Sequence, residues 1–265
     1  KTMYPVSSKN EKDLEILMDI YLDAVFNPNL KNNPNILAQE GWHYHLEDKE
    51  DELIYKGVVY NEMKGAYSSV DEVLDQYVTE QLFSDTSYKY SSGGKPEAIP
   101  SITQEEFLET YNYNYHPSNS YIFLYGDLNV EQYLNHIDSY LNNYDYKDYS
   151  DYNLSRQDNF TADIVKRTYF NEDKAYVAYN YILGDSNEFS KIENIDIIDD
   201  ILLGSSNTEF RKYFIDNNIC EDVYSYVQKD RKETVYSIIF KYVSDDKLES
   251  LDLEYKSLLK GIIDK

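Results

Sequence analysis

Residues 55–66 read Tyr-Lys-Gly-Val-Val-Tyr-Asn-Glu-Met-Lys-Gly-Ala, and the sequence changes its pattern sharply within them. The portion from Val58 to Ala66 predicts a helix. On the N-terminal side of this helix, Trp42–Glu47 and Leu53–Tyr55 alternate apolar and polar residues around an acidic turn at Asp48–Asp51. Alternation of this kind is typical of strands, so we expect a short hairpin followed by a helix.

The residues before this hairpin predict a strand and two helices. Lys1–Val6 alternates like a strand. Ser8 and Glu11 have the spacing of a capping box, which would open a helix that Pro28 ends. The apolar face of that helix consists of Leu14, Leu17, Met18, Tyr21, Leu22 and Val25. A second, short helix is expected between Pro34 and Gly41.

The residues after Ala66 predict a helix and then a long loop. Ser69 and Glu72 again have capping-box spacing. The face of the helix that they would open consists of Val70, Val73, Leu74, Tyr77 and Val78. Residues 84–101 predict a surface loop, because they contain Ser91-Ser92-Gly93-Gly94-Lys95-Pro96 and Pro100.

Two helices and a strand are expected next. Thr103 and Glu106 would cap the first of these helices. Tyr121–Tyr125 is a strongly apolar strand candidate, and Val130–Leu141 has the spacing of a helix with one inner face. Asn142–Asp163 shows no sustained period, which makes it the best candidate for a linker.

The second half begins with strands and then mixes them with helices. Strands are expected at Val165–Phe170, Ala175–Leu183, Val223–Val227 and Thr234–Val243. Helices are expected to carry Ile192–Leu202, Phe210–Phe214 and Leu248–Ile262. Because neighbouring strands read as hairpins, the sequence favours the α+β class over a doubly wound parallel sheet.

The charge of the chain excludes some partners. The sequence of 265 residues has 25 Lys and Arg against 49 Asp and Glu, which gives a net charge of −24. Such a charge repels phosphate backbones and anionic lipid, so neither nucleic acid nor a membrane is expected as a partner. The single cysteine, Cys220, excludes an internal disulfide framework and favours a reducing compartment. With no signal segment at its start, the chain is expected to be cytoplasmic.

Both ends of the sequence favour a segment of a longer polypeptide. Residue 1 is Lys and already lies in a predicted strand, while an amphipathic helix runs almost to Lys265. We therefore expect the remainder of the same polypeptide, or a complementary half, to be a partner of this chain.

The histidines are the first candidates for metal binding. His43 and His45 lie two positions apart in a predicted strand, so both side chains project from the same face. Together with one carboxylate, such a pair could supply the three protein ligands of a catalytic zinc site. The ordinary interpretation is a half-exposed aromatic strand, since spacing identifies no third ligand. His116 is expected at a helix end, where an imidazolium complements the dipole. His136 lies beside the apolar face of a predicted helix and is expected to be a surface or boundary residue.

Common catalytic motifs are missing from the sequence. Neither H-E-x-x-H nor the inverse H-x-x-E-H occurs, and no G-x-S-x-G elbow is present. Cys220 has no histidine nearby and is expected to be a buried structural thiol. Gly93-Gly94-Lys95 is followed by Pro96 and lacks the complete phosphate-loop pattern.

Several blocks nevertheless resemble one family. Gln39-Glu40-Gly41-Trp42-His43-Tyr44 and residues 55–66 resemble the inverted-motif zinc metallopeptidases of the pitrilysin/insulinase superfamily, in particular the presequence-protease and falcilysin branch. The blocks that agree in order are Thr2–Ser8, Ser92-Gly93-Gly94 with Pro96 to Pro100, Tyr115–Tyr121, and Leu202–Ser206 with Phe210-Arg211-Lys212. The block Asn61–Gly65 is the most specific of them.

The resemblance implies a hydrolase that uses zinc and gives Glu62 a role. In this family two histidines of H-x-x-E-H and a glutamate from a later helix hold the metal, and Glu62 stands where that glutamate falls. A carboxylate is a suitable ligand for a catalytic zinc, which keeps one position open. Glu62 is the only site residue that we assign; no catalytic residue is assigned within residues 1–265.

The resemblance also implies how the chain is divided and what it acts on. Residues 1–150 would be the C-terminal part of the zinc-site domain, and residues 151–265 the N-terminal part of a second, non-metal domain. Each would be a largely antiparallel sheet packed with helices. The family's H-x-x-E-H motif would then precede Lys1, so we expect this segment alone to be inactive. The complete protein would be a metalloendopeptidase for unstructured peptides, or alternatively a non-catalytic, peptide-binding scaffold of the same superfamily. His45 replaces a commonly acidic residue, and we have no functional account of that change.

Overall fold

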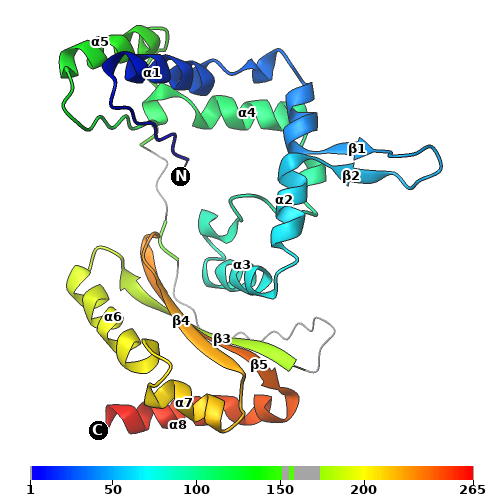
Figure 1. Ribbon diagram of the computed structural model, residues 1–265, viewed down its shortest axis with the longest axis vertical. Helices are drawn as coiled ribbons and strands as arrows, with labels where there is room; N and C mark the ends of the chain where they lie inside the picture. The colour runs from blue at the N-terminus through cyan, green and yellow to red at the C-terminus, as the bar shows by residue number, and fades with distance from the viewer. Residues whose placement is uncertain (1, 151–154, 158–173, 265) are drawn as a thin grey trace. The chain divides into compact units, whose positions relative to one another are not determined.

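A computed structural model describes residues 2–150, 155–157 and 174–264 of the chain (Figure 1). These residues form two compact units, each of which is described by itself. The first unit consists of Lys1–Gly65 and Gly93–Asn153, and the second consists of Ala66–Ser92 and Leu154–Lys265. Helices and antiparallel strands are mixed in the chain, which confirms the α+β class. The predicted peptidase domains at 1–150 and 151–265 stay a prediction, and the compact units differ from them in the placement of residues 66–92.

The first unit is mainly helical. Its helices are α1 (Glu11–Phe26), α2 (Val58–Ala66), α4 (Gln104–Asn114) and α5 (Val130–Leu141). Its strands β1 (His43–His45) and β2 (Ile54–Lys56) pair antiparallel, with Tyr44 opposite Tyr55. The hairpin and the α2 helix were therefore predicted correctly.

The buried core of the first unit is small. Met18, Tyr133 and Ile137 are buried where α1 and α5 pack together. Partly buried residues surround them, namely Leu14, Leu22, Leu124, Leu128 and Leu141. Interdigitation of one face from each helix explains the spacing that predicted α1 and α5.

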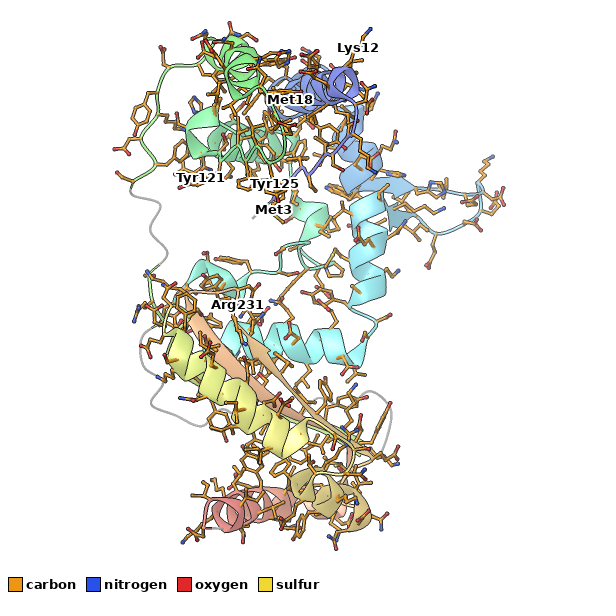
Figure 2. All side chains as sticks on the ribbon, turned by 60° about the vertical axis from the view of Figure 1, so that its left-hand side comes forward. Met3, Lys12, Met18, Tyr121, Tyr125 and Arg231 are labelled. Atoms are coloured by element: carbon orange, nitrogen blue, oxygen red, sulfur yellow. The ribbon has the colours of Figure 1, made fainter. Side chains whose placement is uncertain are left out.

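The expected strands at the two ends of this unit are wrong. Thr2–Val6 and Tyr121–Tyr125 belong to no sheet, because no other described segment pairs with them. Tyr121 is 104% exposed and Tyr125 88% exposed, and both are labelled in Figure 2. An apolar extended segment becomes a strand only where a partner satisfies its backbone groups.

The helix caps agree with the sequence in one case out of three. Thr103 and Glu106 form the predicted capping box at the start of α4. The α1 helix is instead capped by Asn10, whose side chain accepts from the Asp13 N–H. Ser69 precedes the next helix but makes no capping bond within the described part of the chain. Asn is as good an N-cap as Ser, so local geometry decides between them.

The second unit is built on an antiparallel sheet in the order β3-β5-β4. Its strands are β3 (Lys174–Asp185), β4 (Asp222–Gln228) and β5 (Glu233–Ser244). The helices α6 (Phe189–Leu203), α7 (Glu209–Asp216) and α8 (Leu248–Ile263) contribute to its core. These elements confirm the predicted strands and helices after residue 174; the strand expected at Val165–Phe170 lies outside the described residues.

The core of this unit lies between the sheet and these helices. Phe240 at its centre is fully buried, and its ring lies 4.7 Å from that of Phe214 and 5.9 Å from that of Tyr179. Tyr179 stacks on Tyr255 of α8 at 4.1 Å. Cys220 is buried in the same cluster as predicted, and burial raises the pKa of its thiol to about 12.

The helix α3 (Val70–Leu82) lies over the other face of the sheet (Figure 1). Along β5, Tyr236, Ile238 and Phe240 point into the core, so their neighbours point to the opposite face. Those neighbours, Val235, Ser237 and Ile239, are nevertheless at most 3% exposed. The central strand is therefore buried on both faces, and α3 provides cover on the second. None of the described helices is long and apolar enough to cross a bilayer.

Candidate metal-ligand site

The helix that carries Glu62 is fixed at its start by a close approach of two glycines. Gly57 precedes α2 with a φ of +154°, a value that side chains disfavour. A Cβ on Gly57 would lie 2.2 Å from the carbonyl oxygen of Gly41. The Asn61 N–H donates to the Gly57 carbonyl at 3.0 Å and continues the first helical turn. The two blocks of the resemblance that contain Gly41 and Gly57 therefore touch.

A third block of the resemblance also reaches α2. A Cβ on Gly93 would lie 2.2 Å from the sulfur of Met63, so the thioether packs directly on the glycine backbone. The indole N–H of Trp42 donates to the Ile102 carbonyl at 3.0 Å and ties the hairpin to the same loop. Motifs that lie far apart in the sequence are thus gathered around α2, which the sequence alone did not show.

Glu62 itself is exposed on α2. Within the described residues its carboxylate accepts no hydrogen bond and forms no ion pair, so its oxygens are available to a ligand. Its neighbour Met63 faces Gly93, and this contact sets which side of the helix is buried. An anionic oxygen on a helix fits zinc as one ligand out of several.

The other ligands of a zinc site are not among the residues that the structure describes. No group of three His, Cys, Asp or Glu side chains in this part of the chain is arranged to hold a metal ion. Glu62 would therefore supply a single ligand, and any further ligands would come from outside the described residues.

The histidine pair lies on one face of β1, as its spacing predicted. The rings of His43 and His45 are 6.0 Å apart. The Nδ1 of His43 lies 2.6 Å from the Ala38 carbonyl oxygen, and the Nε2 of His45 lies 2.7 Å from a Glu47 oxygen. Both rings are thus engaged locally, and the pair forms no metal group within the described chain.

Glu47 is the most strongly perturbed carboxylate near this pair. Its Oε2 accepts a hydrogen bond from the Lys56 ammonium at 2.9 Å and also lies 2.7 Å from Nε2 of His45. These hydrogen bonds, that of Lys56 first, lower the pKa of Glu47 to about 2. The arrangement is an exposed ion-pair cluster on the hairpin.

The remaining histidines have local structural contacts. His116 Nδ1 accepts from the Ser118 N–H at 3.2 Å and so caps the following turn. The ring lies just beyond the C-terminal end of α4, at the helix end where the sequence predicted it. His136 Nε2 lies 2.9 Å from an Asp19 oxygen between α5 and α1, at the boundary position that was predicted.

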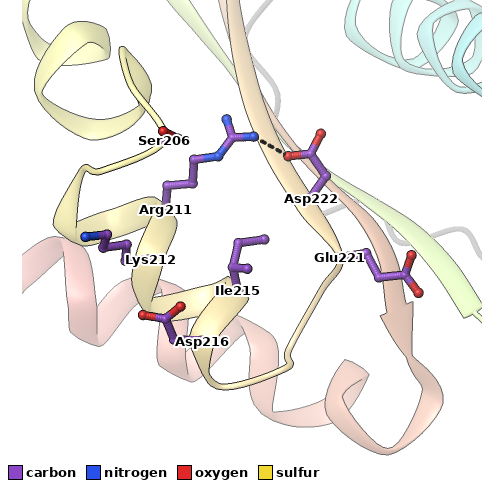
Figure 3. A pocket seen from close by; sticks show the side chains of 7 residues that line it. All are labelled: Ser206, Arg211, Lys212, Ile215, Asp216, Glu221 and Asp222. Carbon is purple, nitrogen blue, oxygen red and sulfur yellow. Dashed lines mark hydrogen bonds and ion pairs between the residues drawn. The ribbon is translucent and has the colours of Figure 1, made fainter.

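A shallow pocket in the second unit does not form a catalytic site. It has a volume of about 230 Å³ and is lined by Ser206, Arg211, Lys212, Ile215, Asp216, Glu221 and Asp222 (Figure 3). Arg211 donates to Asp222 at 2.6 Å, so its charge is already paired. With carboxylates and cations mixed and partly paired, the pocket favours no single charge of ligand.

Comparison with known proteins identifies the family of the chain. The family model described as the peptidase M16 inactive domain matches residues 101–262, which is more than half of the chain. The chain belongs to the M16 peptidase family. Its similarity to presequence proteases, described next, confirms the resemblance to the insulinase superfamily and its presequence-protease branch.

Curated relatives, two of which are described here, match the whole chain. It is 40% identical over 272 residues to Protein HypA of Clostridium perfringens, covering 100% of this chain and 28% of that protein. It is 31% identical over 284 residues to the mitochondrial presequence protease of Xenopus tropicalis, covering 100% of this chain and 26% of that protein. The chain thus spans less than a third of the length of these relatives.

A shorter match and a solved structure complete the comparison. The chain is 48% identical over 127 residues to presequence protease 1, chloroplastic/mitochondrial, of Arabidopsis thaliana, covering 48% of this chain and 12% of that protein. An M16-like peptidase structure from Alicyclobacillus acidocaldarius aligns with a TM-score of 0.48 and 13% identity, over 78% of this chain and 50% of that one.

Proposed function

We propose that this chain is part of a zinc metalloendopeptidase that hydrolyses unstructured peptides, and that Glu62 is one of its metal ligands. Membership of the M16 peptidase family supports the class of enzyme, and relatives named presequence proteases support peptides as substrates. The observation that carries the role of Glu62 is its exposed, unengaged carboxylate on a helix held by Gly57 and Met63.

The contribution of this chain to the reaction is limited to holding the metal. Zinc bound at such a site supplies a Lewis acid for amide hydrolysis. Glu62 would give one anionic oxygen, and the Gly41–Gly57 contact would fix the direction of its helix. Since one carboxylate cannot hold catalytic zinc, residues 1–265 alone are proposed to be inactive.

The test uses the full-length polypeptide that contains this chain. Zinc per molecule is measured by mass spectrometry, and cleavage is followed with a quenched fluorescent peptide. Glu62→Gln is expected to lower bound zinc to a small fraction and to abolish cleavage. Glu109→Gln, an exposed glutamate on α4, is the matched control and is expected to change neither.

Two results would contradict the proposal. Full zinc occupancy and normal cleavage in Glu62→Gln would remove the assigned ligand. Chelator-sensitive cleavage by the purified 265-residue chain would show that the site is complete without further residues.

A non-catalytic scaffold is the second candidate. The description of the matching family model as an inactive domain favours it for the part of the chain beyond residue 101. The codons upstream of Lys1 distinguish the two: an intact H-x-x-E-H supports the enzyme, and its absence supports the scaffold.

We also propose the cytoplasm as the compartment. Cys220 is the one cysteine of the sequence and is buried as a free thiol. A protein that needs no disulfide suits a reducing compartment. Fractionation of cells that carry a tagged full-length protein would test this, and recovery in an organelle would contradict it.

A further inference from the structure

The β1–β2 hairpin projects from the helices of the first unit (Figure 1) and carries an aromatic cluster on one face. Tyr44 pairs with Tyr55 across the two strands, so both side chains lie on the same face. The ring of Trp42 lies 5.6 Å from that of Tyr44 and 5.7 Å from that of Tyr55, edge-on to both. The indole is held by its hydrogen bond to the Ile102 carbonyl. The three rings therefore form a preformed aromatic surface.

The apolar side of the hairpin extends beyond the rings. Leu46 stands two positions after Tyr44, and Leu53 two positions before Tyr55, which is the spacing of residues on one strand face. Tyr44 and Leu53 are each 60% exposed, and Leu46 and Tyr55 are exposed as well. Because soluble proteins rarely expose large contiguous apolar patches, such a surface marks an interaction site. The name aromatic face is used below for Trp42, Tyr44, Leu46, Leu53 and Tyr55.

The opposite face of the hairpin is polar and its groups already have partners. His43 pairs with Lys56 across the strands, and both Lys56 and His45 contact Glu47. A two-stranded hairpin is only marginally stable in water unless another element, such as a helix, packs against it. The aromatic face is therefore the side on which a partner would pack.

The turn of the hairpin is acidic. It carries four exposed carboxylates, which belong to Asp48, Glu50, Asp51 and Glu52. Within the described residues none of these four forms an ion pair, and Lys49 is the one cation among them in the sequence. Carboxylates without a counter-charge attract basic side chains and repel acidic ones. A second copy of this chain would bring the same acidic turn to the contact and is therefore disfavoured as the partner.

We propose that a basic amphipathic helix of the same polypeptide, from outside residues 1–265, packs on the aromatic face. Its apolar stripe would cover the rings and the two leucines, and its Lys or Arg side chains would meet the acidic turn. A helix about 10 Å in diameter spans two strands that lie about 4.8 Å apart. The chain spans less than a third of the length of the curated relatives that match all of it, which leaves a long polypeptide to supply such a helix. The proposal does not depend on the ligand role of Glu62.

The experiment places a photo-cross-linker on the aromatic face of the full-length polypeptide. The amino acid p-benzoylphenylalanine replaces Tyr44, and mass spectrometry identifies the peptides that are joined on irradiation. A second variant carries the cross-linker at Leu53, which leaves the Tyr44–Tyr55 pair intact. The same cross-linker at Ile20, a residue of α1 that is 55% exposed, is the matched control. A mixture of isotope-labelled and unlabelled protein separates cross-links within one copy from those between copies.

The cross-linkers at Tyr44 and Leu53 are expected to reach one common segment outside residues 1–265. In that segment apolar residues should recur at intervals of three and four, and Lys and Arg should outnumber Asp and Glu. The cross-linker at Ile20 should not reach it.

Hydrogen exchange in residues 43–56 tests the part of the charges separately. Glu50→Gln combined with Glu52→Gln removes two charges of the turn and should speed this exchange about threefold, because exposed charge pairs contribute weakly but measurably. A turn without a basic partner would instead be stabilised by the loss of like charges, so its exchange would slow. Glu105→Gln combined with Glu109→Gln, two exposed positions of α4, is the matched control and should leave the exchange unchanged.

Each of several results would overturn the proposal. Cross-links between copies would make the aromatic face a dimer interface, and cross-links to an acidic segment or to residues within 1–265 would assign it a different cover. A lack of cross-links from both positions would leave the face in solvent. Unchanged or slower exchange in the variant with Glu50→Gln and Glu52→Gln would remove the role of the acidic turn. None of these measurements involves zinc, so they succeed or fail independently of the proposed function.

Discussion

The two units differ in how completely they bury their apolar residues. In the second unit, β5 is covered on both faces, and aromatic rings from the sheet and from α7 and α8 meet around Phe240. In the first unit, three buried side chains form the cluster between α1 and α5, while Tyr121–Tyr125 lies largely exposed. Buried apolar area is the main source of folding free energy. The comparison therefore indicates that apolar burial stabilises the second unit more than the first.

The largest expected effect tests the core of the second unit. Phe240→Ala removes a fully buried ring and should lower the free energy of unfolding by about 3–5 kcal/mol. Tyr125→Ala, in the exposed segment of the first unit, should change it by less than about 0.5 kcal/mol. Urea unfolding followed by circular dichroism measures both variants, and equal losses would show that the two units do not differ in this way.

A pair of glycine variants tests the first unit where it holds α2. Gly57→Ala would place a Cβ against the Gly41 carbonyl at a positive φ and should destabilise the unit by about 1–3 kcal/mol. Gly65→Ala has open space and an ordinary helical φ, so it should stabilise α2 by about 0.5–1 kcal/mol. Thermal unfolding distinguishes the two variants, because the midpoint should fall for Gly57→Ala and rise for Gly65→Ala. An unchanged midpoint in Gly57→Ala would contradict the described contact.

Alkaline titration should affect the second unit through its buried tyrosines. Burial, assisted by the nearby Asp75, raises the pKa of Tyr226 to about 12 from the ordinary value of 10.0. The neutral phenol is favoured in the folded state, so its contribution is complete below pH 10.0 and is lost as the pH rises through about 12. Absorbance at alkaline pH should show late ionisation in the wild type that coincides with loss of the strand signal. In Tyr226→Phe the late component should be smaller; an unchanged titration curve would contradict the assignment.

Acid titration should give the smallest effect, on the hairpin of the first unit. The pKa of Glu47 is lowered to about 2 from 4.5 by hydrogen bonds from Lys56 and His45. The ionised carboxylate is favoured in the folded state, so its contribution is complete above pH 4.5 and is lost as the pH falls through about 2. Nuclear magnetic resonance of the carboxyl group measures this pKa, and a value near 4.5 would contradict the ion-pair cluster.

The sequence predicted local elements better than their partners. The α2 helix was expected at Val58–Ala66 and has these bounds. Tyr121–Tyr125 was expected to be a strand on equally strong propensity, but a strand requires a partner that the described residues do not provide. The local sequence pattern determines which secondary structure a segment prefers, but a strand forms only where another strand pairs with it.

The position of α3 shows a second limit of sequence reasoning. Its apolar residues predicted an inner face, yet Asp71 and Asp75 are the residues that bond to β4, and Thr79 bonds to Arg231 in the turn between β4 and β5. The signal that was missed is their spacing of four, together with the tyrosines at alternate positions 224 and 226. A hydrophobicity pattern alone does not predict a helix face that packs against its neighbours through hydrogen bonds.

The site was foreseen only through the resemblance. Glu62 has no local feature that separates it from other exposed helical glutamates, and its ligand role stays a prediction. The structure adds that the blocks containing Gly41, Gly57 and Gly93 surround its helix. That gathering arises from long-range packing, which no local pattern of residues reports.

Anomalous X-ray scattering at the zinc edge from crystals of the full-length polypeptide tests the ligand role of Glu62 most directly. We predict a peak about 2.0–2.2 Å from a carboxylate oxygen of Glu62, the ordinary zinc–oxygen distance. A zinc peak surrounded by other side chains, with the Glu62 carboxylate facing solvent, would contradict the account.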